Sequence, residues 1–335
     1  SSLCPSPCRR LWAEAILCLQ CTGLYARLRM GVRTMRRFAP GLALPAALLC
    51  VRTAAAHSGE PLAPHDLWTA WAFEPGPLLL IGTLGLVYAR AVANLWGAAG
   101  AGRGLPPWRV GTFAGGLLPL WLALLSPLDA LAGVLFSAHM VQHVVLMMAA
   151  APLLALGAPP HIWLWALPLG GRRGIAHWWH KQAAPRRALH RLPLPWLAWL
   201  LSALAMWLWH LPTFYEAALA NEQIHALEHV IFLGTAWLFW DQVLRPQRRT
   251  LFAEGTAILL LFTTALHSGI LGALITFART PWYRSYAATT APWGLTPLAD
   301  QQLAGVIMWA PGGVVYLVGM LALIGDIQSE EEKYS

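Results

Sequence analysis

The chain has 335 residues, of which 57% are hydrophobic and only 11% are charged. This composition, with its recurring long apolar runs, excludes an ordinary soluble domain and predicts a helical protein that crosses the lipid bilayer several times. The formal net charge of +8 is compatible with a nucleic-acid partner, but its distribution along the chain follows membrane topology instead, so no nucleic-acid partner is expected.

The first part of the chain has the features of a secreted protein. Residues 35–56, MRRFAPGLALPAALLCVRTAAA, combine a basic start, an apolar middle and a small-residue end, which predicts a signal peptide cleaved after Ala56. We therefore expect residues 1–34 to be an over-extended or non-native start, and residues 57–74 to form a periplasmic tail. All five cysteines precede Ala56, so the mature chain could hold a metal only through nitrogen, oxygen or thioether ligands.

Seven apolar stretches follow, each long enough or nearly long enough to cross about 30 Å of hydrocarbon as a helix. They are Pro75–Ala93, Val110–Leu125, Leu131–Leu156, Leu194–Trp209, Ile224–Leu244, Leu251–Ala278 and Gln302–Ile324. The predicted fold is all-α: a polytopic seven-transmembrane-helix bundle over residues 75–325, followed by a cytoplasmic tail at residues 326–335.

The basic residues between the predicted spans favour one orientation. With residue 57 outside, the predicted inner segments contain Arg90, Arg103, Arg109, Arg172, Arg173, Lys181, Arg186, Arg187, Arg191, Arg245, Arg248, Arg249 and Lys333. The predicted outer segments contain only Arg279 and Arg284. This positive-inside bias predicts a bacterial inner-membrane protein with its N-terminus outside and its C-terminus in the cytoplasm.

Six histidines on four predicted spans fall at a similar depth, toward the outer side. They are His139 and His143 on the third span, His210 at the end of the fourth, His225 and His229 on the fifth, and His267 on the sixth. Two of these pairs are four residues apart, so each pair lies on one helical face. Because polar groups in a bilayer turn inward and find partners, we expect the imidazoles to converge on one centre.

This pattern predicts a metal site that faces the periplasm. Imidazole is a good ligand for copper, zinc and iron, and nearby thioethers favour Cu(I), although Met147 and Met148 are expected to serve packing. The expected ligands are His139, His143, His225 and His229, with His210 and His267 next. Acidic residues on the same side could orient these rings, namely Asp129, Glu222, Glu228 and Asp300. Helix capping is the alternative role for Asp129 and Asp300.

Four motifs, taken in order, resemble the CtaG-type cytochrome c oxidase assembly factors. They are SPLDALAGVLFSAHMVQHVVLMMAAAPLLALGAP, WHLPTFYEAAL, HALEHVIFLGTAWLFW and DQQLAGVIMW, and the resemblance runs from about Pro75 to Ile324. It implies a non-enzymatic membrane protein that supports the copper step of haem-copper oxidase maturation, with the oxidase core subunit and a periplasmic copper donor as partners. The matching positions are His139, Gln142, His143, His210, His225, His229, Asp300, Gln301, Met308 and Trp309. Glu228 stands where many relatives are expected to have methionine.

Three other interpretations stay open from the residues alone. Paired histidines on different helices could bind haem iron instead of copper. The sequence HALEH matches the H-x-x-E-H arrangement of some zinc proteases, in which Glu228 would activate water. The protein could also be a metal-free scaffold for oxidase subunits, with its histidines forming hydrogen bonds between helices.

Overall fold

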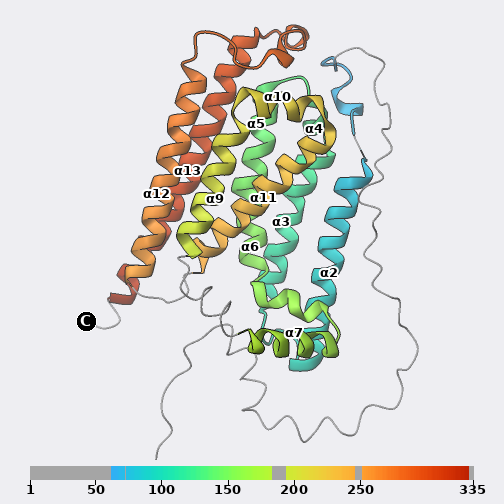
Figure 1. Cartoon of the computed structure of the whole chain (residues 1–335), viewed down its shortest axis with the longest axis vertical. Helices are drawn as coiled ribbons and strands as arrows, with labels where there is room; N and C mark the ends of the chain where they lie inside the picture. Colours follow the sequence, from blue (N-terminus) through green and yellow to red (C-terminus); the bar gives the residue numbers. More distant parts are fainter. Residues whose placement is uncertain (1–61, 72, 183–193, 246–250, 332–335) are drawn as a thin grey trace, which may run out of the picture.

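The structure, a computed structural model, describes residues 62–71, 73–182, 194–245 and 251–331 (Figure 1). Every regular element within these ranges is a helix, which confirms the predicted all-α class. The predicted signal peptide at residues 35–56 and the segment 1–34 lie outside the described residues. So do the basic residues Arg186, Arg187, Arg191, Arg248, Arg249 and Lys333.

The long helices run roughly side by side, and shorter helices cover the two ends of the bundle (Figure 1). In chain order they are α2 (Pro75–Ala99), α3 (Pro107–Leu125), α4 (Pro127–Ala132), α5 (Phe136–Val144), a π-helical turn η4 (Val145–Ala150), α6 (Ala151–Gly157), α7 (Leu169–Lys181), α9 (Leu194–Trp209), α10 (Pro212–Ala220), α11 (Glu222–Leu244), α12 (Leu251–Thr276) and α13 (Pro297–Glu331). Short 3₁₀ helices η3 (Leu67–Thr69), η5 (Pro160–Ala166), η6 (Arg284–Tyr286) and η7 (Ala291–Trp293) lie in the connections.

The predicted count of seven membrane spans is only partly supported. Five described helices are long and apolar enough to cross a membrane: α2, α3, the continuous α5–η4–α6 helix, α12 and α13. A sixth is obtained if α9 and α10, which meet at an angle of 75°, form one broken span. Helix α11 has 23 residues and is long enough to cross a membrane, but it is not apolar enough, because it contains His225, Glu228 and His229.

Several predicted boundaries differ from the structure; for example, the first predicted span ended at Ala93, whereas α2 continues to Ala99. The third predicted span, Leu131–Leu156, is interrupted, because α4 ends at Ala132 and α5 begins only at Phe136. The last predicted span ended at Ile324, whereas α13 continues to Glu331 and includes the first residues of the predicted tail.

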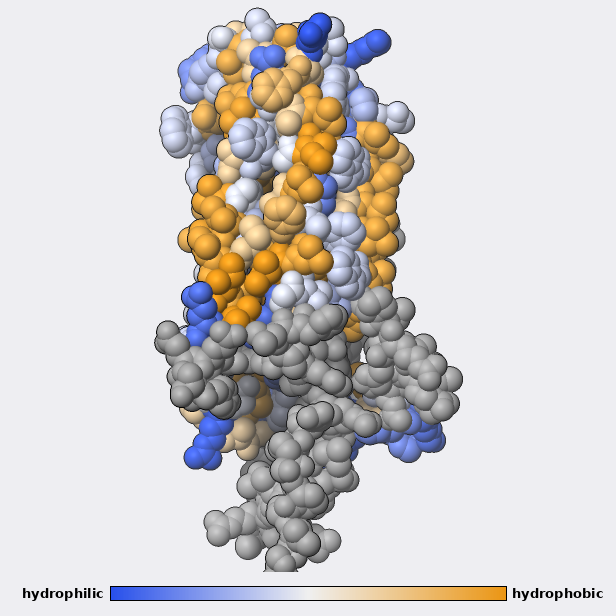
Figure 2. Space-filling view, turned by 90° about the vertical axis from the view of Figure 1, so that its left-hand side faces the viewer, coloured by the Kyte–Doolittle hydropathy of each residue, from blue (hydrophilic) through white to orange (hydrophobic). Residues whose placement is uncertain are grey.

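The α5–η4–α6 helix occupies the centre of the bundle. In its most apolar window 56% of the residues are buried, compared with 17–39% in the other four single-helix spans. It packs against α3, α11 and α13. Figure 2 shows apolar side chains along much of one outer face, and α12 contributes Leu259, Phe262, Leu266, Ile270 and Leu274 to the exposed apolar surface. Exposed apolar side chains at this spacing suit contact with lipid.

Candidate metal centre

Helices α5 and α11 bring the two histidine pairs together. Both helices begin near the end of the bundle that carries α4 and α10 (Figure 1), and each presents its pair from one face. The ring centroids of His139 and His143 are 4.2 Å apart, and those of His225 and His229 are 4.3 Å apart. Between the helices, the centroids of His139 and His225 are 5.2 Å apart and those of His143 and His229 are 5.4 Å apart. The four imidazoles therefore form one cluster.

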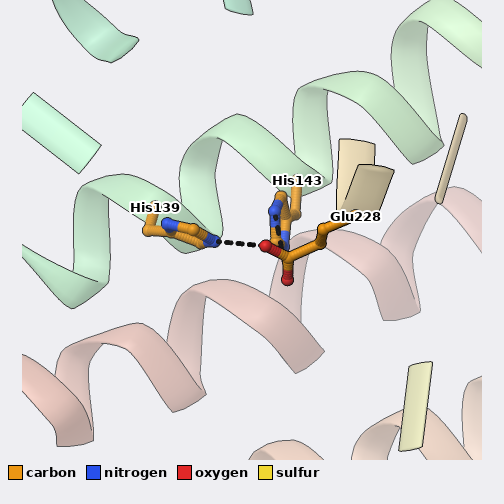
Figure 3. A group of neighbouring side chains, drawn as sticks. All are labelled: His139, His143 and Glu228. Atoms are coloured by element: carbon orange, nitrogen blue, oxygen red, sulfur yellow. Dashed lines mark ion pairs between the residues drawn. The ribbon is translucent and has the colours of Figure 1, made fainter. Parts of the chain in front are cut away.

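Glu228 places a carboxylate at the centre of this cluster. Figure 3 shows His139 and His143 directed toward it, with Oε2 lying 3.8 Å from His139 Nε2 and Oε1 lying 3.9 Å from His143 Nε2. These separations exceed a hydrogen bond. They match donor atoms that share one ion, because bonds of about 2.0–2.2 Å place such atoms about 3–4 Å apart. The donor atoms of these three residues lie within 4.8 Å of one another.

The cluster is sealed from solvent on most sides. Glu228 and His139 are each 1% exposed, His143 is 4% exposed and His229 is 9% exposed. His225 is only partly buried, so its side of the cluster, near the start of α11, is the more open one.

The donor atoms of the cluster lack hydrogen-bond partners. Within the described part of the chain, nothing donates to either oxygen of Glu228, and the Nε2 atoms of His139, His143, His225 and His229 are also unpartnered. Leaving buried polar atoms unsatisfied costs about 1–3 kcal/mol for each neutral group and more for a charged one. A cation would satisfy the carboxylate and the imidazole lone pairs at the same time, so the residues present fit a metal ion.

Asp300 fixes the start of the helix that carries His139 and His143. This residue lies at the start of α13, is fully buried, and accepts hydrogen bonds from Phe136 N at 2.7 Å and Ser137 N at 3.1 Å. It also accepts from the Ser137 hydroxyl. A carboxylate at a helix N-terminus satisfies free N–H groups and complements the helix dipole, so Asp300 acts here as a cap supplied by another helix.

The turn that follows His143 is π-helical rather than α-helical. Trp240 Nε1 of α11 donates to the carbonyl of Met147 in this turn at 2.9 Å. Single π turns inside helices are frequent at functional sites. Here the turn adjusts the face that α5 and α6 present, and the indole of Trp240 ties it to the helix that carries the second histidine pair.

His210 lies beside the cluster, at the break between α9 and α10. Its Nδ1 is 2.6 Å from the carbonyl of Met206, and its own carbonyl accepts from the Tyr283 hydroxyl at 2.8 Å. The ring packs against Phe232, with centroids 6.3 Å apart. His210 and His143 line the same small cavity, so His210 neighbours the cluster without ring contact with its members.

Like His210, the candidate ligand His267 lies outside the cluster of four imidazoles. Its ring contacts Trp199 of α9, with centroids 5.9 Å apart, and it makes no ring contact with the other candidate histidines in the described ranges. His267 lies on α12, whereas the cluster lies between α5 and α11.

Two residues at the site were not expected there as direct contacts. The sequence assigns Glu228 a role in orienting the rings or in proteolysis, yet its carboxylate lies beside the Nε2 atoms of His139 and His143. Tyr215 of α10 lies against His139, with ring centroids 5.1 Å apart. Tyr286 donates to the carbonyl of Ala132 at 3.0 Å, so the Tyr215 hydroxyl, 2.8 Å away, donates to Tyr286. Burial raises the pKa of Tyr286 well above its ordinary value, which keeps the phenol a donor.

A group of carboxylates covers the same end of the bundle. Burial raises the pKa of Asp129 to about 6, although its hydrogen bond from Gln142 Nε2 at 2.6 Å opposes this shift. Burial and the neighbouring carboxylates Glu222 and Asp129 raise the pKa of Glu74 to about 7. At mildly acidic pH these groups therefore hold protons that free carboxyl groups would release.

Comparisons of the sequence with known proteins find a family model and three relatives. The model of the family described as cytochrome c oxidase caa3 assembly factor (Caa3_CtaG) matches residues 86–329. Uncharacterized proteins of Mycobacterium bovis and Mycobacterium tuberculosis are each 27% identical over 261 residues, which is 76% of this chain and 39% of the relative. An uncharacterized protein of Mycobacterium leprae is 24% identical over 289 residues, which is 79% of this chain and 40% of the relative. The chain thus spans about two fifths of the length of these curated relatives. No solved structure matches it.

Proposed function

The chain belongs to the cytochrome c oxidase caa3 assembly factor family, and from this premise we propose that it carries copper for the maturation of a haem-copper oxidase. The ion would be held between α5 and α11 by His139, His143 and Glu228. His225 and His229 would replace these ligands one at a time as the ion enters or leaves. The ion is cargo that enters and leaves unchanged, so the proposed role is not enzymatic.

The observation that carries this proposal is the set of buried donor atoms without partners. A bilayer protein that only needed to pack α5 against α11 would lose free energy by placing a carboxylate and four imidazoles there. One bound Cu(I) would neutralise the carboxylate, and imidazole is a suitable ligand for it.

The partly exposed His225 suggests the route of exchange. We propose that the open side of the cluster faces the periplasm in the bacterial inner membrane, where a copper donor would deliver the ion. The oxidase core subunit would receive it at the same end, around α4, α10 and the connection between α12 and α13. Ligand exchange from His225 inward would move the ion without exposing it to lipid.

The other interpretations have less support from the geometry. A haem needs its two axial histidines on opposite sides of a macrocycle, whereas the four rings here contact one another. In the protease interpretation Glu228 would activate a water held by His225 and His229, yet its oxygens approach His139 and His143 of the other helix.

Metal analysis of the purified protein tests the proposal. After loading with Cu(I) and removal of free ion, the wild type should retain copper, and the His139→Ala/His143→Ala variant should retain clearly less copper per protein, because the cluster can no longer hold the ion. His267→Ala is the matched control, because it also removes a membrane histidine but lies outside the cluster, and it should load as the wild type does.

The same variants separate the copper carrier from a metal-free scaffold. Under the proposal, cells carrying the double variant fail to form the copper centre of the oxidase, while the assembly factor itself is still present in the membrane. Normal oxidase maturation in those cells would support the scaffold. A Soret band in the purified wild type would support haem.

A further inference from the structure

A second group of soft donor atoms lies next to the histidine cluster. A cavity of about 30 Å³ is lined by thioether side chains from four different segments of the bundle, together with His143 and His210. The methionines are Met140 of α5, Met147 and Met148 of η4, Met206 of α9 and Met308 of α13. They are five of the eight methionines in the whole chain.

Packing alone explains methionine in an irregular core, because its flexible side chain fills gaps. It does not explain His210. This residue is 6% exposed, and Nδ1 must carry the proton because the carbonyl of Met206 can only accept. The lone pair therefore lies on Nε2, which has no hydrogen-bond partner in the described segments although it is buried beside the cavity. A ring held in this tautomer by a backbone carbonyl is the usual arrangement of a metal-binding histidine.

We propose that this cavity is a second metal site, for a soft monovalent cation, with His210 Nε2 and methionine thioethers as ligands. Thioether and imidazole ligands select Cu(I) among the metals available to proteins. The lining side chains are neutral, and the cost of burying an ion rises steeply with its charge, so a monovalent ion is favoured over a divalent one. The volume suits one ion, since a water molecule needs about 10–15 Å³ by the same measure, and is too small for an organic ligand.

The position of the cavity gives this site a role. His143 belongs to the histidine–carboxylate cluster and also lines the cavity, so one imidazole could pass an ion between the two sites. The cavity lies inward from Glu228, along η4. This inference rests on the proposed function for its physiological meaning, but the site can be tested without it.

Silver(I) is the probe, because it shares the ligand preferences of Cu(I) without redox chemistry. In a Glu228→Gln/His139→Ala background, which weakens the first cluster, the protein should still bind Ag(I). Adding Met147→Leu, Met206→Leu and Met308→Leu, which largely conserve volume, should weaken Ag(I) binding by about 10-fold or more. Met320→Leu is the control, since Met320 does not line the cavity, and it should leave Ag(I) affinity unchanged.

X-ray absorption of Cu(I)-loaded protein in the same background provides the second measurement. Sulfur neighbours should be present around the ion and should become fewer in the triple methionine variant, which keeps Met140 and Met148. Unchanged Ag(I) affinity in that variant, or a copper environment with nitrogen and oxygen only, would overturn the second site. A wild-type protein whose histidine–carboxylate cluster fails to hold Cu(I), while the second site still binds, would instead contradict the proposed function. The two failures are therefore distinguishable.

Discussion

Glu228 carries a carboxyl group in the interior of an apolar bundle, with imidazole nitrogens as its nearest polar neighbours. Replacing it by Gln should change metal affinity and stability in opposite directions. Cu(I) affinity should fall by about 10-fold or more, because a charged donor is lost. The metal-free protein should become more stable by about 1–3 kcal/mol, because a buried carboxylate without donors is removed and the new amide can donate to imidazole.

Thermal unfolding of the chelator-treated protein in detergent measures the stability change, and Asp326→Asn is the control because that carboxylate is exposed. A lower midpoint for metal-free Glu228→Gln would mean that hydrogen bonds from within the protein, rather than an ion, satisfy the carboxylate.

The carboxylates Glu74 and Asp129 make stability depend on pH. Their pKa values are raised to about 7 and about 6, from ordinary values of 4.5 and 3.8, with burial as the main cause. At pH values between the ordinary and the raised pKa of each group, the folded state binds more protons than the unfolded state. The free energy of unfolding should therefore fall as pH rises from about 4 to about 7. The melting temperature should be higher at pH 5 than at pH 8, and Glu74→Gln/Asp129→Asn should reduce the difference. An equal difference in the variant would assign the pH effect to other groups.

At the scale of elements, the helix that carries His139 and His143 depends on a side chain far away in sequence. Asp300→Ala should leave the N–H groups of Phe136 and Ser137 without their acceptor. The free energy of unfolding should fall by about 1–3 kcal/mol. Hydrogen exchange should accelerate at the start of α5. The matched control is Thr296→Ala, which removes an exposed cap of α13 itself. It should have a smaller effect that is confined to α13.

Helices α12 and α13 approach closely through two glycines. A Cβ atom on Gly305 would lie 2.4 Å from Thr276 Oγ1 and 2.7 Å from the carbonyl oxygen of Gly272. Gly305→Ala should therefore force the helices apart and destabilise the protein by about 1–3 kcal/mol. Gly313→Ala on the same helix meets nothing within 4 Å. It should be neutral or slightly stabilising by thermal unfolding, and equal effects of the two variants would contradict the close approach.

The whole molecule shows which features a single sequence can predict. The length of the apolar stretches predicted nearly every long helix, and the four-residue spacing of the histidine pairs predicted the faces that meet between α5 and α11. These signals are local. Other features depend on how segments that are distant in the sequence pack against each other. They are the position of His267 outside the cluster, the cap that Asp300 gives α5, and the contact of Tyr215 with His139. The spacing of residues within one segment cannot predict such contacts. The predicted count of seven spans is only partly supported for a related reason, because α11 is less apolar where it carries the cluster.

The distribution of charge over the two ends of the molecule predicts its orientation in the membrane. The end with α7 carries Arg172, Arg173 and Lys181, whereas the connection from α12 to α13 carries only Arg279 and Arg284. The positive-inside tendency therefore predicts that the α7 end lies in the cytoplasm and the proposed metal centre near the periplasm. Because no cysteine follows residue 50, a single cysteine introduced after that position can report the orientation of the protein in the membrane. In intact cells a membrane-impermeant thiol reagent should label Ala288→Cys, an exposed position near η6, and should label Gly174→Cys on α7 only after the membrane is opened. The reverse pattern would put the centre on the cytoplasmic side and exclude delivery of copper from the periplasm.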